Sequence, residues 1–116
     1  MYYISGSTAL VIPNKAGMPA LCYTASLKEP TSWKYAGRDY VSTRHLIDDD
    51  GIWDATAVLS RYGYEGDEVV WVASHERAVF DLLIHYCIIK GTIIPNFQAS
   101  HIYGIVCFDQ VVKWLT

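Results

Sequence analysis

A single helical segment constrains the fold of this chain more than any other feature of its sequence. Ser74 is a residue type that caps helix N-termini, and Glu76 places a carboxylate in the first turn, where the helix dipole favours it. From Ala78 to Ile89 the residues are apolar on nearly every side, and Gly91 is placed to end the segment. We therefore predict a helix over about residues 75–90 that is largely buried at the centre of the fold.

Shorter apolar segments on both sides of this helix predict strands and lesser helices. Val69–Ala73 is typical of a buried strand, Trp33–Thr43 of a hairpin, and Ile52–Tyr62 of a helix that Gly63 would cap. Tyr2–Ile12 is compatible with a strand, with a short helix, or with a strand followed by a helix. Further short strands are expected at Ala20–Thr24, Thr92–Ile94 and Tyr103–Phe108, and a last helical turn at Gln110–Leu115.

This order of segments predicts an α+β fold with a small mixed or antiparallel sheet and two to three helices. A chain of 116 residues is the size of one domain, so we expect residues 1–116 to form a single domain. Apolar residues make up 52% of the chain and charged residues 18%, which is typical of a sequence that folds.

Charge and segment lengths exclude some classes of partner. The net charge is −3, whereas domains that bind nucleic acid through bulk charge are usually basic. No apolar stretch approaches the roughly 18 residues of a membrane span, and the N-terminus has no signal-peptide pattern. We expect a cytoplasmic protein without nucleic-acid or membrane partners. The low charge and many aromatic residues favour a protein partner or self-association.

The three cysteines point to the same compartment. Cys22, Cys87 and Cys107 are widely spaced, form no Cys-x-x-Cys pair, and each lies in an apolar run. We interpret them as buried free thiols of a cytosolic protein.

The predicted central helix carries one polar stripe. Arg77, Asp81 and His85 follow one another at intervals of four residues. The stripe is compatible with a general acid/base group, with His85 titrating near neutral pH. It is also compatible with a ladder of ion pairs at the solvent edge of the helix, which is the interpretation that we favour.

Other candidate sites are weaker. Asp48–Asp50 could bind a hard cation, but it lacks the spacing of a calcium loop and fits a solvated loop before a helix. His75 and Glu76 fail the zinc-protease pattern because position 79 is Val. The sequence contains no phosphate-binding glycine loop and no nucleophile motif. We thus predict no catalytic residue, metal or cofactor. The candidate binding residues are Arg77, Asp81, His85 and Trp53.

Three collinear blocks resemble one protein family. Val72–Leu83 is similar to the hydrophobic–x–Ser–x–Glu–Arg–x–x–x–Asp–x–Leu helix start of AbiEi-type antitoxins, which belong to type IV toxin–antitoxin systems. Tyr2–Leu10 resembles the opening of their effector domain, and Trp33–Tyr40 occupies the place of their strand–Gly–strand hairpin. The family's N-terminal winged helix has no counterpart here, its surface is often basic, and His75 stands where Pro is common. The resemblance implies an interaction domain without DNA binding.

These observations predict a non-enzymatic protein-interaction module, antitoxin-like or defence-related, from a mobile genetic element. The alternative is a small enzyme or ligand-binding protein, a hydrolase or a nucleotide-binding protein, with a pocket between subunits. Its site would use His85, Asp81, Arg77 or His45.

Overall fold

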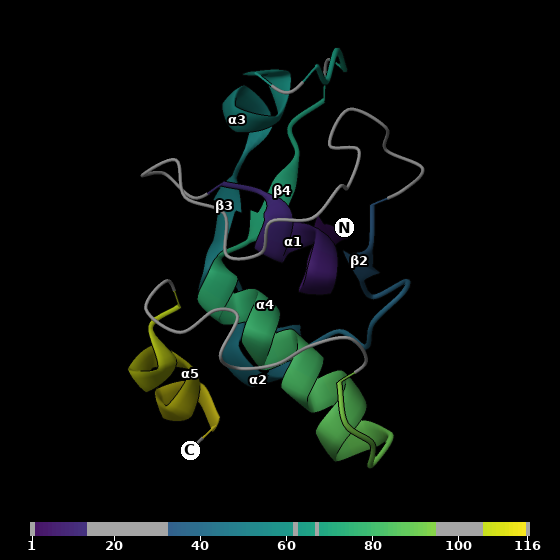
Figure 1. Cartoon of the computed structure of the whole chain (residues 1–116), viewed down its shortest axis with the longest axis vertical. Coiled ribbons are helices and arrows are strands. Elements are labelled where there is room, and N and C mark those ends of the chain that lie inside the picture. Colours follow the sequence, from purple (N-terminus) through teal and green to yellow (C-terminus); the bar gives the residue numbers. More distant parts are fainter. Residues whose placement is uncertain (1, 14–32, 62, 67, 95–105, 116) are drawn as a thin grey trace.

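A four-stranded mixed sheet lies at the centre of the molecule (Figure 1). The computed structural model describes residues 2–13, 33–61, 63–66, 68–94 and 106–115. The strands are β1 (Tyr3–Ile4), β2 (Tyr35–Ala36), β3 (Ile52–Asp54) and β4 (Trp71–Ala73), in the order β2-β1-β4-β3. β1 pairs parallel with β4 and antiparallel with β2, and β3 pairs antiparallel with β4. The α+β class and the mixed sheet are therefore confirmed.

Helices pack around this sheet. The described residues contain α1 (Gly6–Val11), α2 (Arg44–Ile47), α3 (Thr56–Arg61), α4 (His75–Leu82), a π-helix η2 (Leu83–Ile89) and α5 (Phe108–Leu115). They outnumber the two or three helices that we expected, because α1 and α2 form in segments too short to show a helical period. α4 contacts both α1 and α5, and α3 lies at the opposite end of the sheet (Figure 1).

The predicted central helix forms, and its first half is buried as expected. The Ser74 hydroxyl accepts a hydrogen bond from the backbone N–H of Arg77 at 3.1 Å, and all residues of α4 except Glu76 are buried. After Leu82 the helix widens into η2, where His85 is the buried residue and Ile88 and Ile89 face solvent. Gly91 has a φ of +67°, the left-handed conformation common at helix ends.

Long-range strand pairing corrects one local prediction. Ile52–Asp54 does not begin a helix but forms β3, with Ile52 opposite Ala73 and Trp53 opposite Val72. The helical part is shortened to α3, in which Leu59 is buried as its spacing predicted. The backbone hydrogen bonds gained along β4 outweigh the local helical pattern.

The structure also tests the predictions for the other segments. Of the three alternatives for Tyr2–Ile12, the strand followed by a helix is correct. The expected hairpin at 33–43 is wrong, because β2 pairs with β1 and a turn follows it. Thr92–Ile94 is not a strand. The expected strand Ala20–Thr24 and the first half of Tyr103–Phe108 lie outside the described residues, while the C-terminal helix already begins at Phe108.

The prediction of buried thiols is wrong for two cysteines. Cys87 lies on the solvent side of η2 and Cys107 just before α5, and both are exposed free thiols. An apolar run in the sequence did not predict burial here, because Ile88, the residue after Cys87, is itself exposed. Cys22 lies outside the described residues.

No helix in the described ranges is long and apolar enough to cross a membrane.

Candidate functional site

The polar stripe of α4 forms a buried network. Arg77 and Asp81 are both 0% exposed, and the Arg77 Nε–Asp81 Oδ1 distance is 3.3 Å. The expected ion pair between Arg77 and Asp81 forms, but its placement at the solvent edge is wrong, because the side of α4 that carries these residues packs against β1 and the start of α2. This placement equally keeps the pair away from open solvent, where a substrate would arrive.

Hydroxyl groups from two other segments donate hydrogen bonds to Asp81. Its carboxylate accepts hydrogen bonds from Tyr3 Oη at 2.7 Å, Ser5 Oγ at 2.6 Å and Thr43 Oγ1 at 2.6 Å. Arg77 in turn donates to Thr43 Oγ1 at 2.9 Å and to the Asp50 carbonyl at 2.7 Å. A buried ion pair is tolerated when its remaining hydrogen-bonding capacity is satisfied in this way.

The buried, negatively charged surroundings of Tyr3 shift its pKa. Burial, followed by the negative charge of Asp81, raises the pKa of Tyr3 from 10.0 to about 12. The phenol thus stays protonated and donates to Asp81 at any physiological pH. Neither Tyr3 nor Thr43 was identified from the sequence, because their role depends on contacts 78 and 38 residues along the chain from Asp81.

His85 holds η2 to the loop that precedes α2. Its Nδ1 accepts a hydrogen bond from the backbone N–H of Val41 at 3.1 Å. Its ring meets Tyr40 and Tyr86 edge-on, with centroid distances of 5.3 and 4.7 Å. Burial, and then the positive charge of Lys90, lower the pKa of His85, so the ring is neutral at pH 7 and Nδ1 is free to accept.

The network and His85 together fix α2 against α4 and η2. Thr43 is the residue directly before α2, and Val41 lies two residues earlier. Because the first is bound to Asp81 and the second to His85, the start of α2 is held at a set distance from the central helix. A groove remains between the two.

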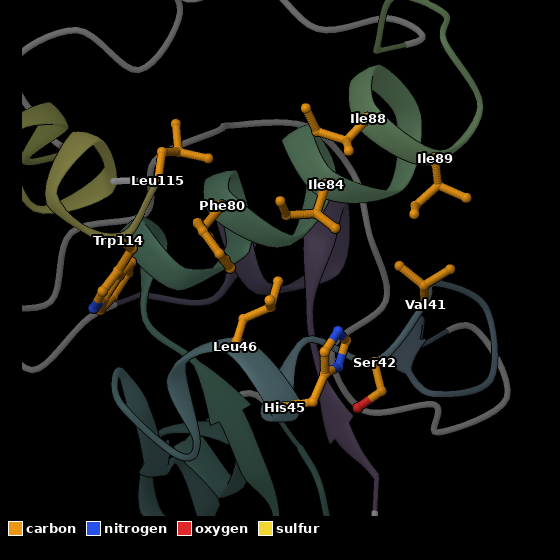
Figure 2. Close-up of a pocket in the computed structure, with 10 residues that line it drawn as sticks. All are labelled: Val41, Ser42, His45, Leu46, Phe80, Ile84, Ile88, Ile89, Trp114 and Leu115. Carbon is orange, nitrogen blue, oxygen red and sulfur yellow. The ribbon is translucent and has the colours of Figure 1, made fainter.

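An apolar groove, with a volume of about 640 Å³, lies between α2, the α4–η2 helix and α5 (Figure 2). Figure 2 shows Leu46 pointing from α2 toward Phe80 and Ile84, with Trp114 and Leu115 at one end and Val41 and Ile89 at the other. Among the described lining residues only Ser42 and His45 are polar. The lining residues are Val41, Ser42, His45, Leu46, Phe80, Ile84, Ile88, Ile89, Trp114 and Leu115.

Several of the groove's apolar side chains are exposed to solvent. The exposed fractions are 50% for Leu46, 66% for Ile88, 62% for Ile89 and 46% for Leu115. We call these four residues, with the groove between them, the apolar face. Sequence reasoning missed this face because Ile88 and Ile89 follow the buried α4 without a break in the apolar run, although both are exposed in the structure.

The candidate binding residues do not form one site. Arg77 and Asp81 lie in the buried network, and His85 lies beside it on η2. Trp53 is half-buried on the edge strand β3, packed against the core and pairing with Val72 of β4. Of the residues considered for a pocket, His45 is the one that lines the groove.

The acidic loop and the groove offer no donor set for a metal. Asp48, Asp49 and Asp50 are exposed, and Asp49 pairs with Arg44 at 2.9 Å. Within the described residues no three His, Cys, Asp or Glu side chains gather as metal ligands would.

No protein-family model matches this chain, and neither a curated protein nor a solved structure matches it.

Proposed function

We propose that this chain is a non-enzymatic protein-interaction module and that the apolar face is its docking surface. The observation that carries the proposal is the cluster of exposed Ile88, Ile89, Leu46 and Leu115 around a groove of about 640 Å³. Small proteins rarely leave large aliphatic side chains gathered around a hollow unless another surface covers them. The rigid hold on α2, through Asp81 and His85, keeps the groove preformed for a partner.

The biological setting of the proposal comes from the family resemblance. The AbiEi-like blocks support an antitoxin-like or defence-related role, in which the chain binds and neutralises a protein encoded by the same mobile genetic element. The blocks at Val72–Leu83 and Tyr2–Leu10 contain Arg77, Asp81, Tyr3 and Ser5, which build the buried network. These motif residues therefore support the scaffold and leave partner recognition to the apolar face.

Affinity capture with matched variants tests this function. The tagged chain is expected to retain one protein at stoichiometric yield from cells of its source. Ile88→Asp should lose that protein, because a buried carboxylate in the interface is strongly unfavourable. Val69→Asp is the control: Val69 is 54% exposed but lies before β4, away from the groove. If wild type, Ile88→Asp and Val69→Asp retain the same proteins equally, the docking surface is not this face.

One observation favours the alternative function, a ligand-binding protein or hydrolase with a pocket between subunits. His45 lines the groove beside Ser42, and both belong to the wall formed by α2 and its preceding loop (Figure 2). Their imidazole and hydroxyl would contact any small molecule held there. A nucleotide panel that raises the melting temperature of wild type, but not of His45→Ala, would support this alternative. No shift with any nucleotide would contradict nucleotide binding at this groove.

A further inference from the structure

We infer that the occupant of the apolar face is a second copy of this chain, related to the first by a two-fold axis. The inference rests on the proposed function, since it concerns the same face: a second copy covers the face of the free chain, and another protein that docks there would displace that copy. Three properties of that face support it: its area, its shape and its lack of charge.

The area matches the need of a stable dimer. At their exposed fractions Leu46, Ile88, Ile89 and Leu115 each present on the order of 100 Å² of apolar surface, so the four present roughly 400 Å². A standard interface buries about 800 Å² per partner, of which somewhat more than half is non-polar. The apolar face therefore supplies close to the whole non-polar share of one side.

The face has both protruding side chains and a hollow, the two features that a self-pairing surface needs. η2 carries the protruding side chains Ile88 and Ile89 at the rim, and the hollow beside them has Phe80 and Ile84 in its wall (Figure 2). In a two-fold interface the same patch serves both subunits, so a rim residue of one copy meets the hollow of the other. Ile88 and Ile89 from each copy can then fill the groove of its partner at the same time.

The charge of the face also favours a copy of itself. No Asp, Glu, Lys or Arg is among the described residues that line the groove. Two copies can therefore approach through this face without placing like charges opposite each other, although the chain carries a net charge of −3. A face without charges has no means of selecting a strongly charged partner.

A dimer of this kind would enclose the polar pair of the groove. Ser42 and His45 line the same hollow that the partner's η2 would close, so both side chains would lie between the subunits.

Sedimentation velocity and light scattering across a wide range of protein concentration test the inference. Wild type should have the mass of a dimer that dissociates on dilution. Ile88→Asp and Ile89→Asp should be monomers at concentrations where wild type is dimeric, and Val69→Asp should remain a dimer. Far-UV circular dichroism and thermal unfolding of each variant establish that it is folded.

The outcomes separate this inference from the proposed function. The wild-type chain could be monomeric at every concentration and still capture another protein that Ile88→Asp loses. That result would overturn the inference of a second copy but would leave the docking surface intact. A dimer that both isoleucine variants preserve places the interface elsewhere and overturns the inference. Loss of both self-association and capture in Ile88→Asp, with neither lost in Val69→Asp, supports both.

Discussion

The guanidinium of Arg77 and the carboxylate of Asp81 illustrate how much of a residue's role the sequence reveals. Their spacing of four residues on one helix was apparent, and so was the need of a polar pair on an apolar helix for partners. The hydroxyls of Tyr3, Ser5 and Thr43 were not apparent, because distant segments supply them. The pair is bonded to β1 and to Thr43, the residue directly before α2, so a local motif holds distant parts of the chain together.

Removing the cation from this network should strongly destabilise the protein. In Arg77→Met the Asp81 carboxylate remains buried without its counter-ion, and the expected loss is about 3–5 kcal/mol in the free energy of unfolding. The control is Arg38→Ala, which removes the exposed Arg38–Asp39 pair and should cost less than about 1 kcal/mol. Urea unfolding measures both variants. Similar losses for the two variants would show that the buried Arg77–Asp81 pair contributes no more to the free energy of unfolding than an exposed pair.

Tyr3 should make the protein sensitive to alkali. Its pKa is raised to about 12 in the folded state, so its contribution is complete below pH 10 and is lost as the pH rises through 12. The part of the stability at stake is on the order of 2 kcal/mol. Tyr3→Phe should flatten the fall in stability over this range, whereas Tyr2→Phe, at an exposed position, should leave it unchanged. An alkaline profile that is identical in wild type and Tyr3→Phe would refute the assignment.

His85 should make the stability of the protein fall on acidification, the opposite direction of pH from Tyr3. Its pKa lies below the ordinary 6.5, so its contribution is present above that pH and is lost as the pH falls through the folded value. Protonation also converts Nδ1 into a donor and breaks the bond from the Val41 N–H. Asn at this position retains an acceptor but does not titrate, so the stability of His85→Asn should fall less on acidification. Parallel acid profiles for wild type and His85→Asn, measured by denaturant unfolding, would contradict this.

At the scale of elements, local signals succeeded where they were strong. The Ser74 cap and the apolar run located the start of α4 to the residue, because a capping side chain acts within one turn. β3 was missed because its three residues owe their conformation to pairing with β4. η2 was missed because no sequence period distinguishes a π-helix from the α-helix that it continues.

Variants of Ser74 measure how much the N-terminal cap stabilises α4. Ser74→Ala removes the acceptor for the Arg77 N–H and should lower the free energy of unfolding by about 1 kcal/mol. Ser74→Asp, which retains an acceptor and adds a charge that the helix dipole favours, should restore most of it. The denaturation midpoints of the two variants give the comparison. Equal destabilisation by both would mean that the cap does not stabilise α4.

At the scale of the whole molecule, the fold class followed from the order of segments, and the apolar face did not. The face needs α2, η2 and α5 to be brought together from positions far apart in the chain, and it needs Ile88 and Ile89 to be turned outward at the end of a buried helix. Composition did favour a protein partner, because a chain with 18% charged residues has little polar surface with which to cover its aliphatic side chains.

Hydrogen–deuterium exchange at high and low protein concentration tests the central claim, that a second copy of this chain covers the apolar face, most directly. We predict that backbone amides of Arg44–Ile47, Leu83–Ile89 and Phe108–Leu115 exchange more slowly at high concentration, while those of Thr56–Arg61, at the far end of the sheet, do not change. Exchange in Leu83–Ile89 that is independent of concentration, or slowing confined to the β3 edge, would contradict the account.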